Sequence, residues 1–229
     1  MTQSRSGYKY LQLEDIVYSY PQTGFQLKGI NLGFKRGEFT AISGPNGSGK
    51  TTLGKIMAGI IKADSGQVMI DGLDTREVSL GRIGKRVGYL FQEPGRQLFT
   101  GSVKEELAFT LSFREEEKEE IERLSKKALE DFSLSGLEEE APFRLSAGEK
   151  QRLALAALII NQPDFLILDE PTKGLDPLRK EELTVILKNL QDSGVGMAVI
   201  SHDNSFIEEN ADRIILLSRG ELIETRSTH

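Results

Sequence analysis

The stretch Gly44-Pro45-Asn46-Gly47-Ser48-Gly49-Lys50-Thr51 decides the fold, because Gly44 and Gly49 bracket four residues and are followed by a lysine and a hydroxyl side chain. The run Phe39 to Ser43 before it is typical of a strand, and Lys50 to Ala58 after it is typical of a helix. Glycines let backbone N–H groups close around phosphate oxygens, the helix start adds positive potential, and the lysine reaches the outer phosphates. The stretch predicts a phosphate-binding loop in an α/β chain.

A second strand signal, Phe165-Leu166-Ile167-Leu168-Asp169-Glu170, ends in two carboxylates. A buried strand ending in this way would place Asp169 on Mg²⁺, which the Thr51 hydroxyl can also bind, and would leave Glu170 facing the γ-phosphate. An aspartate at a strand end can also be only a turn residue or a helix cap. The phosphate loop in the same chain favours the metal-binding interpretation.

The third motif is Leu145-Ser146-Ala147-Gly148-Glu149-Lys150-Gln151-Arg152. Ser146 followed three residues later by Glu149 predicts a capping box at a helix start. Read alone, the motif is more often only a helix start. With the phosphate loop in the same chain, a second helix start that faces a phosphate becomes the more attractive interpretation.

Composition excludes several classes of protein. The chain has 229 residues, 38% hydrophobic and 28% charged, and no cysteine, which rules out disulfides, cysteine-zinc sites and a thiol nucleophile. Its net charge of −6 argues against a nucleic-acid partner. The longest apolar run, Leu153 to Ile160, is far shorter than the roughly 20 residues of a membrane-spanning helix. The start, Met1 to Tyr10, lacks the apolar core of a secretory signal, so we expect a cytoplasmic protein.

The pattern of apolar runs divides the chain into three stretches. Short strand-like runs alternate with glycine-rich turns in the first: Leu11 to Tyr18, Ile30 to Phe34, Phe39 to Ser43, Gln67 to Ile70 and Val87 to Phe91. Helix signals replace them from Ser102 to about Asn161, including an amphipathic helix within Arg114 to Phe132. Buried strand and helix signals then alternate: Phe165 to Leu168, Asp176 to Gln191, Met197 to Ile200 and Arg213 to Leu217. This pattern predicts parallel strands with crossover helices and an all-helical insertion, entered at Pro94-Gly95 and left at Gln162-Pro163.

From Tyr10 to Glu224 the sequence resembles the nucleotide-binding subunits of ATP-binding cassette (ABC) transporters. The phosphate loop, LSAGEKQR, the strand ending in Asp169-Glu170, the segment Pro171 to Asp176 and Ser201-His202-Asp203 occur in the family's order. The resemblance implies one domain, residues 1–229, with a P-loop NTPase core of mixed sheet and an antiparallel β subdomain. Residues 1–92 and 163–229 would form the core with its β subdomain, and residues 93–162 the inserted all-helical subdomain.

The resemblance also implies an ATPase that works as a head-to-tail dimer with ATP and Mg²⁺ as cofactors. Residues 44–52, from Gly44 through Thr52, would hold the phosphates of one ATP, and Ser146, Ala147, Gly148 and Glu149 of the other subunit would close on the γ-phosphate. Glu170 would polarise the attacking water, and His202 would bond the γ-phosphate. Gln92 would lie near Mg²⁺, and Asp176 would bridge the two sites.

Tyr20 matches the family's adenine-stacking aromatic, and the less favoured alternative is a strand-packing tyrosine beside Tyr18. Two residues depart from the commonest pattern. Ala147 replaces the first glycine of a usual pair, which a helix start tolerates. Lys173 stands where a small residue is usual, near the expected dimer seam, and could make closure of the site depend on salt.

Within this family, Phe91-Gln92-Glu93-Pro94-Gly95-Arg96-Gln97-Leu98-Phe99 and the EELAF run ending at Phe109 are similar to the ATPases of energy-coupling-factor transporters. These importers take up vitamins or transition-metal ions. The likeness implies a transmembrane coupling subunit and a small substrate-binding membrane subunit as partners. Residues around Gln92 to Thr100 and the helical insertion would form the groove that receives a coupling helix. The chain would then lie on the cytoplasmic face of the membrane.

Two alternatives remain open at this stage. One is the ATPase subunit of another ABC importer or exporter, from which the segment around Gln97 would distinguish this chain. The other is a soluble ABC protein without a transport role, against which the single cassette and the acidic composition argue.

Overall fold

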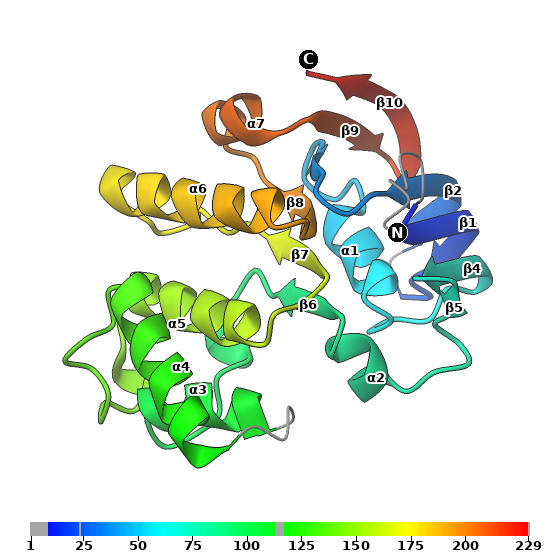
Figure 1. Ribbon diagram of the computed structural model, residues 1–229. Coiled ribbons are helices and arrows are strands. Elements are labelled where there is room, and N and C mark those ends of the chain that lie inside the picture. The colour runs from blue at the N-terminus through cyan, green and yellow to red at the C-terminus, as the bar shows by residue number, and fades with distance from the viewer. Residues whose placement is uncertain (1–8, 23, 113–116, 229) are drawn as a thin grey trace, which may run out of the picture.

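The computed structural model describes residues 9–22, 24–112 and 117–228 (Figure 1). Its strands are β1 Leu11–Ser19, β2 Gln26–Phe34, β3 Phe39–Ser43, β4 Ser65–Ile70, β5 Leu73–Asp74, β6 Val87–Leu90, β7 Phe165–Asp169, β8 Gly196–Ile200, β9 Arg213–Ser218 and β10 Glu221–Ser227. Its α-helices are α1 Lys50–Met57, α2 Leu80–Gly84, α3 Val103–Ser112, α4 Lys118–Asp131, α5 Ala147–Ile160, α6 Pro177–Asp192 and α7 Asn204–Asn210, with short 3₁₀ turns η1 Pro94–Arg96 and η2 Pro142–Arg144. The polar start before Lys9 and the expected helix start at Arg114 lie outside the described residues.

A six-stranded sheet in the order β10-β9-β3-β8-β7-β6 forms the centre of the molecule. Strands β9, β3, β8, β7 and β6 are parallel, and only β10 runs antiparallel to its neighbour β9. The predicted parallel strands with crossover helices are therefore confirmed. Because the carboxyl ends of parallel strands meet at one edge, the ends of β3, β7 and β8 are brought together.

The residues of β7 show why the strands of this sheet appear in the sequence as continuous apolar runs. All five of its residues are buried. Phe165 and Ile167 pack into a core shared with α1 and the smaller sheet, whereas Leu166 and Leu168 pack into a second core shared with α5 and α6. Successive side chains of a strand point to opposite faces, so a sheet covered on both faces needs apolar residues at every position.

The smaller sheet is antiparallel, in the order β2-β1-β4-β5, and lies beside α1 in Figure 1. The prediction of a strand beginning at Ile30 was wrong by four residues, because β2 begins at Gln26. Pairing with β1 extends it, since Gln26 lies opposite Ser19. Exposed Gln26 and Lys28 flank buried Leu27, which is the alternation typical of a strand. The predicted strand began at Ile30 and therefore left these three residues out.

Three helices, α3, α4 and α5, gather on the side of the molecule away from the antiparallel sheet (Figure 1). In the described part of residues 93–162 every regular element is helical. The predicted amphipathic face is confirmed, because Ala128 and Phe132 are buried and Ile121 and Leu124 pack against the same core. The boundaries of the helical subdomain at residues 93 and 162 remain a prediction.

Candidate nucleotide-binding site

The loop between β3 and α1 has a backbone shape that requires glycine at two positions. Gly44 has φ 144°, and a Cβ there would lie 1.9 Å from the Leu217 carbonyl oxygen. Gly49 has φ 104°, and a Cβ there would lie 2.6 Å from the Phe25 ring. Because no side chain fits either position, the loop backbone lies directly against its neighbours.

Lys50 begins α1 and is almost fully buried, with 6% of its surface exposed. Its Nζ donates to the carbonyl oxygens of Gly44 at 2.7 Å and Pro45 at 3.0 Å, which folds the loop around the ammonium group. Burial lowers the pKa of Lys50, and the charges of Glu170 and Asp169 oppose that shift. The Ser48 hydroxyl in the same loop is buried without a hydrogen-bond partner.

Asp169 lies at the end of β7 with 1% of its surface exposed. Tyr89 donates to its Oδ2 at 3.4 Å, and the Thr51 hydroxyl also bonds its carboxylate. Burial raises the pKa of Asp169, and these two hydrogen bonds oppose the shift. The carboxylate of β7 and the first turn of α1 are therefore in direct contact.

Glu170 follows in a left-handed backbone conformation with φ 56°, which is uncommon for a residue other than glycine. Its amide donates to the Ile200 carbonyl of β8 at 2.8 Å. The His202 Nε2 lies 3.6 Å from Glu170 Oε1, and 47% of the histidine side chain is exposed. Burial raises the pKa of Glu170, with the His202 charge acting in the opposite direction. The ends of β7 and β8 thus present a carboxylate and an imidazole side by side.

Lys50, Asp169, Glu170 and His202 line a single pocket of about 620 Å³, whose lining does not include Gly44, Pro45 and Ser48 of the loop. The structure brings the following predicted site residues together in the lining of this pocket: Tyr20, Asn46, Gly47, Gly49, Lys50, Thr51, Thr52, Gln92, Asp169, Glu170 and His202. Phe25 and Ile200 also line it and were missed. Phe25 follows Tyr20 across the β1-β2 turn, with ring centroids 6.3 Å apart, and Ile200 ends the buried strand before His202. The sequence carries a signal for each of them: Phe25 is an aromatic residue close to Tyr20, and Ile200 ends a predicted strand.

The pocket does not include the residues of the third motif. Ser146 and Ala147 are exposed at the start of α5, where Ser146 Oγ accepts from the Glu149 amide at 3.3 Å and Glu149 Oε2 accepts from the Ser146 amide at 2.7 Å. The predicted capping box is therefore present. Asp176 is likewise exposed and caps α6 by accepting from the Arg179 amide at 3.0 Å. None of Ser146, Ala147, Gly148, Glu149 and Asp176 lines the pocket of their own chain.

The segment after Gln92 is fixed by two side chains. Gln97 Oε1 accepts from the Phe91 amide at 3.0 Å. Glu106, only 3% exposed, accepts from the amides of Phe99 and Thr100, both at 3.0 Å. The Phe99 ring is nevertheless 67% exposed and meets Phe109 edge to face, beside a hollow of about 260 Å³. This segment holds an aromatic side chain at the surface.

Comparison of folds assigns the class of protein. The chain superimposes on MJ0796, a dimeric ATP-binding cassette in a post-hydrolysis state bound to ADP and Pi, with a TM-score of 0.87 and 28% identity, over 96% of this chain and 99% of that one. The fold is therefore that of a P-loop NTPase of the ABC ATPase type. A model of the ABC transporter family matches residues 27–173. The chain belongs to this family and is an ATP-hydrolysing subunit that binds ATP.

Relatives are similar along nearly the whole chain. A putative ABC transporter ATP-binding protein of Pyrococcus horikoshii is 41% identical over 93% of this chain and 81% of its own length. The energy-coupling factor transporter ATP-binding protein EcfA of Methanothermobacter thermautotrophicus is 40% identical over 93% of this chain and 69% of its own length. The structure of cbiO1 from Clostridium perfringens, part of the ABC transporter complex cbiONQ, has a TM-score of 0.82 and 33% identity, covering 96% and 89% of the two chains. Across the described residues, none of the helices has the length and apolar character to cross a membrane.

Proposed function

We propose that this chain is the ATPase subunit of an energy-coupling-factor importer and that the pocket beside α1 holds Mg-ATP. Glycine N–H groups of residues 44–49 bind the phosphates, together with Lys50 and the hydroxyl of Thr52. The buried ammonium group of Lys50 at the pocket wall supports an anion here, because its hydrogen-bond partners in the loop are two neutral carbonyl groups and a buried charge is costly unless it is paired. Tyr20 at the pocket wall stacks on the adenine ring.

The donor set around Asp169 fits magnesium. Mg²⁺ prefers oxygen ligands and commonly takes one or two from protein side chains, with phosphate and water oxygens completing its shell. Thr51 and Asp169 already touch, and Gln92 lines the same pocket. In the bound state Mg²⁺ would neutralise charge on the outer phosphates.

Glu170 and His202 act on the other side of the γ-phosphate. The Glu170 carboxylate accepts a hydrogen bond from the attacking water and orients it. His202, 3.6 Å away, donates to a γ-phosphate oxygen. The partial burial of Glu170 supports this role, because a raised carboxyl pKa makes a better proton acceptor.

The pocket of one chain is half of the working site. Ser146, Ala147 and Gly148 are presented at the start of α5 but stay outside their own pocket, so we assign them, with Glu149 behind them, to the ATP held by a second subunit. The second subunit is another copy of this chain or a similar ATPase. Asp176, exposed at the start of α6, lies at the seam between the two sites.

The import role is carried by one observation, the 40% identity with EcfA over 93% of this chain. The similarity to cbiO1 of a cbiONQ complex supports the same assignment. We therefore propose a transmembrane coupling subunit and a small substrate-binding membrane subunit as partners, docked at the segment of residues 92–100 on the cytoplasmic face. The cargo would be a vitamin or a transition-metal ion.

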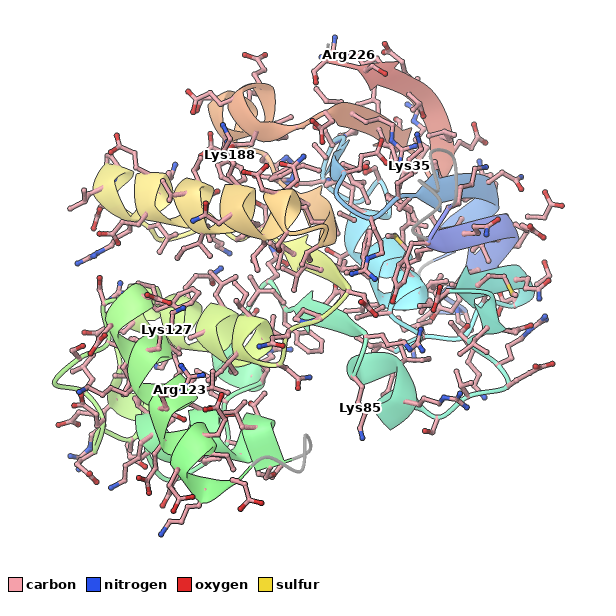
Figure 2. All side chains as sticks on the ribbon, in the orientation of Figure 1. Lys35, Lys85, Arg123, Lys127, Lys188 and Arg226 are labelled. Atoms are coloured by element: carbon pink, nitrogen blue, oxygen red, sulfur yellow. The ribbon has the colours of Figure 1, made fainter. Side chains whose placement is uncertain are left out.

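The net charge of −6 argues against a nucleic-acid clamp. Figure 2 labels six basic side chains spread over the molecule, two of them on α4: Lys35, Lys85, Arg123, Lys127, Lys188 and Arg226. A ribosome or DNA surface favours a continuous basic stripe.

Affinity purification tests this proposal. Tagged Glu170→Gln protein is recovered with ATP from mildly solubilised membranes of its host, and its companions are identified by mass spectrometry. A multi-spanning subunit together with a small hydrophobic protein is the expected result. A multi-spanning partner alone would move the chain to another class of ABC transporter, and recovery of only ribosomal, DNA-repair or assembly proteins would overturn the transport role.

A further inference from the structure

A buried amide connects the third motif to the carboxylate pair. Gln151, in the second turn of α5, is 2% exposed, and its Nε2 donates to the Pro171 carbonyl at 3.0 Å. Pro171 has no N–H, so this carbonyl is its single backbone hydrogen-bonding group. We propose that Gln151 is a positioning residue that holds Glu170 through Pro171 and thereby ties the start of α5 to the ATP pocket of the same chain.

Glu170 needs such support because its backbone is unfavourable in two ways. Its φ of 56° is rare outside glycine. The following proline also pushes the residue before it toward extended conformations. Conformations of this kind are unfavourable and persist only where the surroundings determine them.

Hydrogen bonds hold both sides of Glu170. On one side, its amide donates to the Ile200 carbonyl at 2.8 Å, which fixes the turn to β8. On the other side, the Gln151 amide fixes the next carbonyl to α5. Loss of the second bond leaves a buried carbonyl without a partner, and the Lys173 amide, which donates to the Glu170 carbonyl at 3.1 Å, would hold that side of the turn without it.

The segment after Pro171 lies on the first turn of α5 as well. Gly148 lies beneath it, since a Cβ at Gly148 would be 3.4 Å from the Gly174 carbonyl oxygen. The start of α5 and the turn that carries Glu170 are thus in contact at Gly148 and at Gln151. This inference rests on the proposed function, in which the start of α5 serves the partner's ATP while Glu170 serves its own. The same amide then links the two ATP sites of a dimer.

The first measurement is steady-state ATP hydrolysis by Gln151→Met, which keeps the size of the side chain and removes the donor. We expect kcat to fall about tenfold, a loss equal to roughly 1.4 kcal/mol of transition-state stabilisation, with ATP affinity within about twofold of the unchanged chain. Gln151→Leu, which also removes the donor and has an apolar side chain, should behave alike. Gln191→Met is the control, because the Gln191 amide also joins a helix to a distant segment, donating from α6 to Asp212 before β9 at 2.7 Å, and Gln191 lies outside the pocket lining.

A mixed dimer identifies the site through which Gln151 acts. One chain carries Glu170→Gln and the other Ser146→Ala, and differently tagged chains allow the mixed dimer to be isolated. One composite site is then doubly disabled, and the other combines the intact Glu170 of the second chain with the intact Ser146 of the first. Gln151→Met is added to either chain in turn.

The inference requires that Gln151→Met lowers kcat when it is placed in the chain that supplies the intact Glu170. A loss confined to the other placement would mean that Gln151 only supports the start of α5, and equal loss with Gln191→Met would reduce it to a general structural role. Either result overturns the inference. A mixed dimer that hydrolyses no ATP before Gln151 is changed would instead count against the composite site, and so against the proposed function.

Discussion

Ser146 gives the sharpest test of the composite site, because the structure offers a matched control for its substitution. Ser146 Oγ accepts from the Glu149 amide at 3.3 Å and caps α5. Ser79 Oγ accepts from the Arg82 amide at the same 3.3 Å and caps α2, outside the pocket lining. Ser146→Ala and Ser79→Ala therefore remove the same kind of cap at two different places.

Stability should respond similarly in the two variants. Loss of a serine cap costs about 1 kcal/mol. For a chain of this size that loss lowers Tm by about 2–4 °C. Thermal unfolding followed by circular dichroism measures this part of the effect.

Dimer formation should respond only to Ser146→Ala. A hydrogen bond to a charged phosphate contributes about 1.5–3 kcal/mol. Ser146 Oγ donates to Glu149 Oε2 at 2.7 Å and must release that carboxylate first, so we take the lower value. Two composite sites then lose about 3 kcal/mol, which weakens the ATP-dependent dimer about 100-fold.

The assay is sedimentation of Glu170→Gln protein with ATP over a range of protein concentrations, with either serine substitution added. Ser79→Ala should leave the dimer dissociation constant within about twofold of the parent. If Ser146→Ala also leaves the dimer dissociation constant unchanged, and lowers Tm by as much as Ser79→Ala does, then Ser146 is only a helix cap. Its assignment to the partner's ATP is then wrong.

Further expectations concern the pocket and the docking segment. Burial raises the pKa of Glu170, so the carboxylate that orients water is lost as pH falls through that raised value. We therefore expect kcat to decline in acid at a higher pH than for a glutamate with an ordinary pKa. A decline of kcat at the ordinary glutamate pKa would contradict this role. Lys50→Met should weaken ATP binding about 10- to 100-fold in a calorimetric titration, since it removes a charged donor to phosphate, whereas Lys188→Met on α6 should bind normally. Arg96→Glu should leave the ATPase activity of the isolated chain near normal and reduce recovery of membrane partners, because Arg96 is exposed and lies outside the pocket lining. Undiminished recovery would remove the docking segment from the interface.

Much of the fold could be predicted from local pattern. The strand Phe39–Ser43 was predicted with its observed bounds, and the helix of Asp176 to Gln191 differs by one residue at each end, because a capping aspartate and a following proline mark its start chemically. The start of β2 was mispredicted, because Gln26 is a strand residue only through its pairing with β1. Short elements such as α2 and β5 carry too few residues for a periodic signal.

The sequence alone determined the class of chemistry, because the phosphate loop, the paired carboxylates and the capping box are encoded in neighbouring residues whose local geometry follows from their side chains. Only the tertiary structure decided which of these groups meet. The parallel order of β3, β7 and β8 brings Lys50, Asp169, Glu170 and His202 to one pocket, although more than a hundred residues separate the first from the others. It also leaves Ser146 outside that pocket and places the Gln151 amide on Pro171, since contacts between distant segments depend on how the helices pack on the sheet.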